Sequence, residues 1–313
     1  MRAFALDEFG RPGSVHEIPT PEPGEGQVRV KVQAGAINPF DNAVLGGMLK
    51  DRMPHHFPLI PASDLSGIVD EVGDGVEGFK VGDHVFGQVG QMELGHGSLA
   101  EYTVASSGTI ARRPDSIDPE FGAALPLAGV SALQSIQPIG LKQGDVVVIL
   151  GAGGGIGGFA TQMAKSAGAV VVGIAGNDKL DYVRSLGADE VIDYAATNVV
   201  EAVRKAYPKG IKAVVHTAGD AETLAGLAGL VSDGGFVVSM RGGAKVDELA
   251  ARQITGLNVM TNTTTSALDQ VSAMVMAGDM KRPAIKTFTL ADAGSAFAEI
   301  GNGHVRGKLV VLP

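Results

Sequence analysis

The sequence predicts an α/β protein in which a doubly wound parallel sheet follows a β-rich domain. Three observations support this fold class. Residues 1–120 contain short segments of alternating polarity between Pro and Gly turns, residues 121–262 alternate apolar strands with helices, and a glycine-rich turn joins the first of those strands to its helix. Because alternating strands and helices build parallel sheets, the middle of the chain is expected to carry that sheet.

The N-terminal domain is predicted over residues 1–122. Segments 27–34 and 65–72 alternate apolar and polar residues, as strands do when one face is buried and the other is solvated. After the central domain, residues 266–277 and 291–299 are predicted helices, and residues 308–312 form a last strand that returns to the first domain. We therefore expect residues 264–313 to complete the N-terminal domain.

The central domain is predicted over residues 123–263. Its apolar segments lack polar alternation, as in a parallel sheet that helices cover on both faces. The six segments are 146–150, 170–174, 190–192, 213–216, 236–239 and 257–260. Strands in this number make a complete Rossmann sheet.

A glycine-rich turn follows the first of these strands. Gly153, Gly155 and Gly158 satisfy the pattern G-x-G-x-x-G, in which the missing side chains permit a tight turn and a close backbone approach to a pyrophosphate. The amphipathic helix that follows directs its first free N–H groups at the phosphate. The next strand completes a βαβ unit, and this context indicates a dinucleotide site rather than an ordinary glycine-rich turn.

The end of the second strand bears on which dinucleotide binds. An NAD site usually places a carboxylate there for the ribose 2′-hydroxyl, but this chain has Ala175, followed by Gly176, Asn177, Asp178 and Lys179. The missing acid leaves room for a 2′-phosphate, with Lys179 as its counter-charge. Two alternatives stay open: Lys179 is a solvated residue at a helix start, or Asp178 reaches a ribose hydroxyl.

Composition disfavours several classes of function. The chain has 313 residues, no cysteine and a net charge of −9. The lack of cysteine excludes disulfides, thiolate catalysis and cysteine-ligated zinc, and the negative charge disfavours nucleic acid or an anionic membrane as the main partner. The N-terminus lacks a signal-peptide pattern and no apolar run approaches the ~18 residues of a membrane span. We therefore expect a cytoplasmic protein with a small-molecule, electrophilic substrate.

Segments along nearly the whole chain resemble the zinc-free quinone oxidoreductase branch of the medium-chain dehydrogenases/reductases. They are GAINPFDNAVLGG (35–47), FPLIPASDLSGIVDEVGDGVEGFKVGDHVFG (57–87), GSLAEYTV (97–104), LPLAGVSAL (125–133), GAGGGIGGFATQMAKSAGA (151–169), LGADEVIDY (186–194) and HVRGKLVVLP (304–313). The resemblance implies a GroES-like β-barrel domain beside the Rossmann domain, with the substrate reduced in the cleft between them. It also implies a homodimer joined through a Rossmann sheet edge, for which residues 257–260 are apolar enough.

The resemblance also assigns cofactor residues. It places Lys179 and Tyr194 at the 2′-phosphate, which agrees with the missing acid at Ala175 and implies NADPH. The expected cofactor-binding residues are Gly153, Gly155, Ile156, Gly157, Asn177, Lys179, Tyr194, Ala218, Gly219, Ser239, Met240, Arg241 and Asn262. Several of them follow strand ends, where ligands bind in such sheets.

No metal site is expected. Where zinc relatives carry Cys and Gly-His-Glu, this chain has Asn38, Pro39 and Asp41 in one segment and Ala62, Ser63 and Asp64 in the other. The seven histidines show no ligand spacing. Without a Lewis acid, alcohol oxidation lacks the means to stabilise an alkoxide, which leaves hydride transfer to a quinone or an α,β-unsaturated carbonyl.

Asn38 and Asp41 are the candidate catalytic residues. The Asn38 amide can donate to the substrate oxygen on which negative charge develops, without changing its own charge. The alternative is that both residues brace the turn before a helix. Three methionines are candidates to line an apolar cleft, although methionine is a common core residue: Met48, Met53 and Met92.

Two other functions stay open. An enoyl-thioester reductase needs a basic surface for the phosphates of its coenzyme or carrier, and this chain offers two small clusters, Lys50/Arg52 and Lys281/Arg282. An NADPH-binding sensor with low turnover shares the same architecture, because a fold does not determine a function.

Overall fold

The computed structural model describes residues 1–90 and 93–313, which form two compact units. The first unit contains Met1–Leu127, Thr263–Ala273 and Arg282–Pro313, and the second contains Ala128–Asn262 and Met274–Lys281. The chain therefore leaves the first unit and later returns to it. Among the described helices, none combines the length and the apolar character needed to cross a membrane.

The second unit is built on a six-stranded sheet with the order β10-β9-β8-β11-β12-β13. Every neighbouring pair of strands is parallel. The strands are β8 (Val146–Leu150), β9 (Val170–Ala175), β10 (Glu190–Asp193), β11 (Ile211–His216), β12 (Val231–Ser239) and β13 (Thr255–Asn258). This is the 3-2-1-4-5-6 order of the Rossmann fold, so the predicted parallel α/β sheet is confirmed.

Apolar side chains of this sheet pack with its helices in one core. Val148, Val172 and Val214 are fully buried in a cluster that also contains Val203 and Leu227 from two helices. Continuous burial explains why these strands show no polar alternation. The helices that lie wholly or mainly in this unit are α3 (Pro126–Ile136), α4 (Gly155–Ser166), α5 (Leu180–Ser185), α6 (Val199–Ala206), α7 (Ala221–Ala228) and α8 (Val246–Ala250).

The sixth strand begins and ends two residues earlier than predicted. Asn258 is its last residue, and the Asn258 side chain both accepts the N–H of Ala244 and donates to the Ala244 carbonyl, each at 2.9 Å. Met260, the predicted strand end, is 90% exposed. The apolar residues 257–260 had predicted a strand that ends at Met260. The strand instead ends at Asn258, whose side chain bonds to Ala244.

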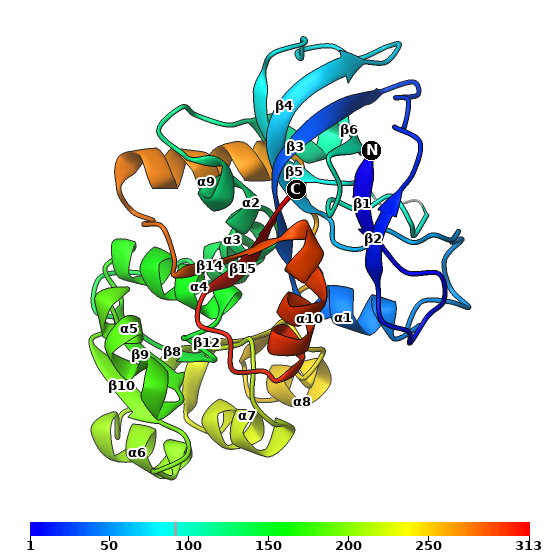
Figure 1. Cartoon of the computed structure of the whole chain (residues 1–313). Coiled ribbons are helices and arrows are strands. Elements are labelled where there is room, and N and C mark those ends of the chain that lie inside the picture. Colours follow the sequence, from blue (N-terminus) through cyan, green and yellow to red (C-terminus); the bar gives the residue numbers. More distant parts are fainter. Residues whose placement is uncertain (91–92) are drawn as a thin grey trace. The chain divides into compact units, whose positions relative to one another are not determined.

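The first unit is built on a mainly antiparallel sheet with the order β14-β15-β3-β4-β5-β7, in which β6 also pairs with β3. β1 and β2 form a separate pair. The strands are β1 (Arg2–Ala5), β2 (Ser14–Glu17), β3 (Gln27–Ile37), β4 (Asp64–Val72), β5 (His84–Gln88), β6 (Tyr102–Ser106), β7 (Ile110–Arg112), β14 (Ile285–Thr289) and β15 (Lys308–Leu312). β3 is the long curved strand of this sheet (Figure 1), and its register against β4 shifts at two points, as β-bulges allow.

The C-terminal segment completes this sheet. β15, red in Figure 1, pairs antiparallel with the blue strand β3 and parallel with β14. The predicted return of the last strand to the N-terminal strands is confirmed. The helices of this part are α1 (Pro39–Leu45), α2 (Pro119–Ala124), α9 (Thr265–Ala277) and α10 (Ala293–Gly301), of which α9 continues into the second unit.

The end of α9 and the following turn belong to the second unit. The Ser166 hydroxyl donates to Asp279 at 2.7 Å, and the Lys281 N–H donates to the Gln162 side chain at 2.7 Å. Ser166 and Gln162 lie on α4, so these bonds attach residues 274–281 to that helix. Sequence patterns alone had grouped all of 264–313 with the first domain.

The candidate residues lie at two sheet edges, one in each unit. In the second unit, the parallel strands β8, β9, β11 and β12 end at one carboxyl edge of the sheet. In the first unit, β3 ends at Ile37, and its neighbours β4 and β15 begin at Asp64 and Lys308. Asn38, Asp64 and Lys308 therefore meet at one end of the antiparallel sheet.

Candidate cofactor and active sites

A glycine-rich turn connects β8 to α4 at the carboxyl edge of the parallel sheet. Gly151 has a φ of +95°, in the region that favours glycine, and α4 begins after Gly154, which offers no side-chain cap. A Cβ at Gly157 would lie 2.2 Å from the carbonyl oxygen of Gly151. A Cβ at Gly158 would lie 3.1 Å from a Leu186 methyl group. Gly157 is thus the glycine that lets the helix approach the end of the strand.

Three predicted cofactor residues, Gly153, Lys179 and Tyr194, lie around the end of β9. A Cβ at Gly153 would lie 2.7 Å from Cδ of Lys179, so the lysine side chain packs directly on the glycine turn. A Cβ at Gly176 would lie 3.4 Å from the hydroxyl of Tyr194 and 3.1 Å from Oδ1 of Asp178. Gly153 therefore leaves room for the Lys179 side chain before α4, and Gly176 leaves room for the Tyr194 hydroxyl at the end of β9.

Lys179 is a buried cation. It is 8% exposed, and burial lowers its pKa, against the opposing effect of the negative charge of Asp178. Within residues 1–90 and 93–313, no salt bridge joins its ammonium to a carboxylate. A buried charge without a bonded anion is destabilising. Its place beside a helix N-terminus and a glycine turn fits the phosphate groups of a dinucleotide.

The turn after β11 is attached to the end of β8. The N–H of Ala218 and the hydroxyl of Thr217 donate to the Leu150 carbonyl at 3.2 and 2.9 Å. Gly219, with a φ of +101°, completes the turn. Ala218 and Gly219 are exposed, so both predicted residues are accessible to a ligand at this edge.

Ser239, at the end of β12, is fully buried and its hydroxyl is engaged. The oxygen accepts the N–H groups of Arg241 and Gly243 at 3.1 and 3.0 Å, and it lies 3.0 Å from Nδ1 of His216. Burial lowers the pKa of His216. Its Nε2 lies 3.5 Å from the Gly219 carbonyl oxygen, which can only accept, so in the neutral ring Nε2 carries the hydrogen and Nδ1 accepts from Ser239. Ser239 therefore shapes the turn that carries Met240 and Arg241.

Three further predicted cofactor residues lie near helix starts or after a strand end in the same unit. Ile156 is half-buried in the first turn of α4, and Asn177 is exposed just before α5. Asn262 is exposed, and its carbonyl accepts a 2.7 Å bond from Nε2 of Gln134.

Asn38, Asp64 and Lys308 form a buried network in the first unit, each at most 3% exposed. Nδ2 of Asn38 donates to Oδ2 of Asp64 at 2.9 Å. Nζ of Lys308 donates to Oδ1 of Asn38 at 2.5 Å and to Oδ2 of Asp64 at 3.3 Å. Oδ1 of Asp64 accepts from the Gln88 side chain at 2.8 Å and from the Leu127 N–H at 3.1 Å. The Asn38 oxygen and one amide hydrogen are therefore engaged, which leaves its second hydrogen.

Asp41 is a buried carboxyl group in the first turn of α1. Its Oδ2 accepts the backbone N–H of Asn38 at 2.7 Å, as the third residue of a helix does in a capping box. Burial raises the pKa of Asp41 to about 7, opposed by the Asn38 N–H and reinforced by the charge of Asp64. The carboxyl both braces the turn and can exchange a proton near neutral pH.

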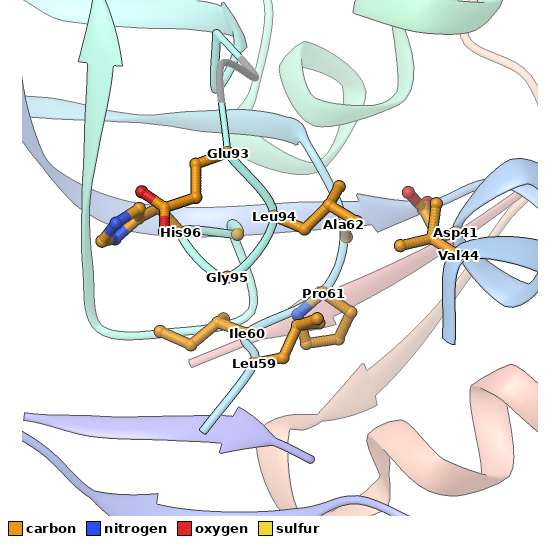
Figure 2. Close-up of a pocket in the computed structure, with 11 residues that line it drawn as sticks. Asp41, Val44, Leu59, Ile60, Pro61, Ala62, Glu93, Leu94, Gly95 and His96 are labelled. Atoms are coloured by element: carbon orange, nitrogen blue, oxygen red, sulfur yellow. The ribbon is translucent and has the colours of Figure 1, made fainter. Parts of the chain in front are cut away.

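Asp41 also lines a small cavity within the first unit (Figure 2). The other lining residues are Val44, Leu59, Ile60, Pro61, Ala62, Glu93, Leu94, Gly95, His96 and Gly97. Its volume of about 10 Å³ is room for about one water molecule. The cavity is too small for an organic substrate and can hold a water-sized group beside the carboxyl.

Several residues of these arrangements were not assigned a role from the sequence. Lys308 begins an apolar strand and would ordinarily be taken for a solvated strand start. Its burial follows from the pairing of β15 with β3.

Of the predicted cleft methionines, Met48 is 50% exposed, Met53 packs against the cluster around Val44, and Met92 lies outside the described residues.

Comparisons with known proteins agree with this architecture. Residues 24–115 match the alcohol dehydrogenase GroES-like domain family, and residues 186–311 match the zinc-binding dehydrogenase family. The chain is 34% identical to the chloroplast envelope quinone oxidoreductase homolog of Arabidopsis thaliana, over 100% of this chain and 98% of that protein. It is 29% identical to the chloroplastic NADPH-dependent alkenal/one oxidoreductase of the same plant, over 100% and 80%. The quinone oxidoreductase structure from Coxiella burnetii covers 100% of this chain and 99% of its own, with a TM-score of 0.88 and 28% identity.

The chain belongs to the quinone oxidoreductase branch of the medium-chain dehydrogenases/reductases. The GroES-like match confirms the second part of the predicted fold class. The resemblance aligns the zinc ligands of zinc-dependent relatives with the segments that hold Asn38 and Asp64 here. In this chain, the ammonium of Lys308 already lies 3.3 Å from Oδ2 of Asp64. A cation side chain therefore occupies this place, and the residues do not fit a zinc ion, although one matched family is described as zinc-binding.

Proposed function

We propose that this protein is an NADPH-dependent reductase that transfers hydride to a quinone or an α,β-unsaturated carbonyl without zinc. The observation that carries the proposal is the buried Lys179, which packs on Gly153, forms no salt bridge among the described residues and follows a strand with no acid at Ala175. The names of two relatives, a quinone oxidoreductase homolog and an NADPH-dependent alkenal/one oxidoreductase, support these acceptors.

NADPH, when bound, supplies the hydride, and the protein binds and orients it. The glycine turn and the start of α4, including Gly155, Ile156 and Gly157, would hold the pyrophosphate. Lys179, Tyr194 and Asn177 would hold the 2′-phosphate end. The residues proposed for the nicotinamide end are Ala218, Gly219, Ser239, Met240, Arg241 and Asn262, with Ser239 acting through the turn that it shapes.

Asn38 is the proposed donor to the substrate oxygen. Its second amide hydrogen is available for that bond, while Lys308 polarises the amide through Oδ1. Asp41 is the proposed proton store, because reduction consumes one hydride and one proton and this carboxyl has a pKa of about 7. The proton passes to the reduced acceptor directly or through a water molecule.

The decisive experiment compares NADPH and NADH oxidation with quinones, enones and enoyl thioesters in the presence of EDTA. We expect NADPH-selective turnover of quinones or enones that persists under chelation. A preference for enoyl thioesters would move the assignment to that class of reductase. Tight NADPH binding without turnover would favour a sensor, and a preference for NADH would overturn the role of Lys179.

Asn38→Ala tests the active-site part of the proposal. Removal of one donor to a developing oxyanion lowers kcat about 10²- to 10³-fold in enzymes of known mechanism. We expect a fall of that order in kcat, with an unchanged KM for NADPH and an unchanged circular dichroism spectrum. A variant that folds and keeps its kcat would remove Asn38 from the chemistry.

We further propose a homodimer that pairs the parallel sheets through β13. This strand ends the sheet order, and Met260 just beyond it is 90% exposed. Light scattering after size exclusion should give twice the chain mass, and Met260→Lys should shift the protein towards the monomer.

A cytoplasmic location stays a prediction, because two plant relatives carry chloroplast names. Imaging of the tagged full-length protein in its own cells would test it.

A further inference from the structure

Three potential metal ligands converge on one side of the first unit. His56 precedes β4, whereas Glu93 and His96 lie between β5 and β6. One ligand atom from each residue lies within 4.8 Å of the others. Figure 2 shows Glu93 and His96 side by side on their loop, on the opposite side of the cavity from Asp41. Sequence spacing missed this group because 37 positions separate His56 from Glu93.

The geometry of this cluster is close to that of a metal site. Nδ1 of His56 lies 3.2 Å from Oε1 of Glu93, and two ligands on one tetrahedral zinc ion are about 3.3 Å apart when their bonds are about 2.05 Å. The rings of His56 and His96 have centroids 4.3 Å apart. All three ligand atoms therefore lie close enough together to face one ion.

The backbone holds the two segments in register. The His56 N–H donates to the Leu94 carbonyl at 3.2 Å, and the Leu94 N–H donates to the Pro54 carbonyl at 2.9 Å. Gly95 has a φ of +133°, and a Cβ there would lie 2.4 Å from Cε1 of His56. The glycine therefore lets the His56 ring pack on the loop, so the ligands are placed before any ion binds.

The charges around the cluster also favour a cation. Glu93 pairs with His56, and in the described parts of the chain no Lys or Arg forms a salt bridge with it. His84 and Asp115 offer an instructive contrast, because they form a similar pair at 3.4 Å but share their surface hollow with Arg112 and Arg113. Among the described residues, that second pair belongs to no group of three potential ligands, and the nearby carboxylate of Asp83 is paired with Arg112.

We propose that His56, Glu93 and His96 bind one divalent transition-metal ion, with water in the open position. Two imidazoles and one carboxylate suit Zn²⁺, whereas Mg²⁺ and Ca²⁺ prefer oxygen ligands. The ion would fasten residues 54–57 to the 93–96 loop. None of the three ligands belongs to the Asn38, Asp64 and Lys308 network, so the role we propose for the ion is to stabilise this part of the fold.

Zinc titration of the untagged, EDTA-treated full-length protein tests the site. Calorimetry should show one ion bound per chain, and Tm should rise with zinc concentration because the ion binds the folded state. Glu93→Gln and His96→Ala should each weaken binding at least ~10-fold, because each removes a direct ligand and loss of an outer-shell partner alone costs about that much. His84→Ala, the matched control, should bind like the unchanged protein.

Each outcome bears on the proposal. Absence of saturable one-to-one binding would overturn it, as would binding that either Glu93→Gln or His96→Ala leaves intact. Circular dichroism and NADPH affinity identify any variant that fails to fold. Co²⁺ provides a second readout in the unaltered protein, since inner-sphere nitrogen ligands give it intense visible bands; a spectrum of the hydrated ion would overturn the site.

Discussion

Two buried lysines show how differently the two units use a positive charge. Lys308 is 3% exposed and bonds to Asn38 and Asp64. Lys179 is 8% exposed, packs on a glycine turn, and has a lowered pKa because burial disfavours its charge. Asp64 neutralises the Lys308 charge within the fold, whereas no salt bridge among the described residues neutralises Lys179. A buried cation that the fold leaves unpaired marks a place for an anionic ligand.

The contrast separates residues that hold the fold from residues that hold a ligand. If it is right, removal of Lys308 should damage stability, whereas removal of Lys179 should damage cofactor selection and leave stability intact. The same distinction applies to Asp41 and to the glycines of the turn, since each combines a structural contact with a place near a candidate site.

The largest effect is expected for Lys308→Met. The change would leave the Asp64 carboxylate buried without its counter-charge, and breaking a buried pair in this way costs about 3–5 kcal/mol. Urea unfolding should show a loss of that size in the free energy of unfolding. The double variant Lys308→Met/Asp64→Asn should recover much of the loss, because both charges are then absent. A single variant as stable as the unchanged protein would show that the network does not rely on this charge.

Asp41→Asn should change how stability depends on pH. The folded-state pKa of Asp41 is about 7 against a reference value of 3.8, so the folded protein holds this proton more tightly. Its contribution is complete below the reference value and is lost as pH rises towards 7, by up to roughly 4 kcal/mol. The variant carries no such ionisation, so its stability relative to the unchanged protein should increase over that range.

Urea titrations at several pH values measure this difference. Asp51→Asn removes an exposed carboxyl in the turn after α1 and is the matched control. A difference between Asp41→Asn and the unchanged protein that stays constant with pH would mean that the Asp41 carboxyl has the same pKa in the folded and unfolded states, which would contradict the raised value.

The parallel sheet could be predicted because its signals are local. Six apolar segments and one glycine-rich turn sufficed, and the observed strands follow them closely. Two strands depart from the prediction: β12 begins at Val231 rather than at residue 236, and β13 ends at Asn258, whose side chain bonds to Ala244. A bond between residues far apart in the chain leaves no mark on local hydrophobicity.

The same difference between local signals and contacts across the chain explains which candidate sites could be predicted. Gly153 follows the first strand and Lys179 the second strand of one βαβ unit, so their spacing in the sequence predicts their meeting. Asn38 and Lys308 are 270 positions apart and meet because β15 pairs with β3. The sequence singled out Asn38 as a donor but could not show that its oxygen is engaged, nor that Asp41 is buried.

Gly157→Ala tests the structural part of the glycine turn. The new Cβ would lie 2.2 Å from the Gly151 carbonyl oxygen, and such overpacking costs about 1–3 kcal/mol. Gly154→Ala is the matched control in the same turn, where the nearest atom would lie 3.6 Å away. We expect urea unfolding to show a loss for the first variant and a smaller one for the second. Equal losses would mean that the turn opens without cost.

The smallest change in stability, and the sharpest one in function, is expected for Lys179→Met. Methionine keeps most of the packing on Gly153 but removes a buried charge, so the free energy of unfolding should stay the same or rise. A charge-assisted bond to phosphate contributes about 1.5–3 kcal/mol, and its loss should raise KM for NADPH about 10- to 100-fold. KM for NADH, which lacks the phosphate, should change little.

Lys142→Met is the matched control, since this exposed lysine lies before the amino end of β8, away from the carboxyl edge. It removes the same charge from the same unit and should leave the ratio of the two KM values unchanged. If Lys179→Met raised both KM values equally, the 2′-phosphate would have another partner. If Lys179→Met lowered the free energy of unfolding as much as Lys308→Met, Lys179 would be a structural lysine. Without ligand, removal of a lysine should cost stability only where the fold itself neutralises its charge.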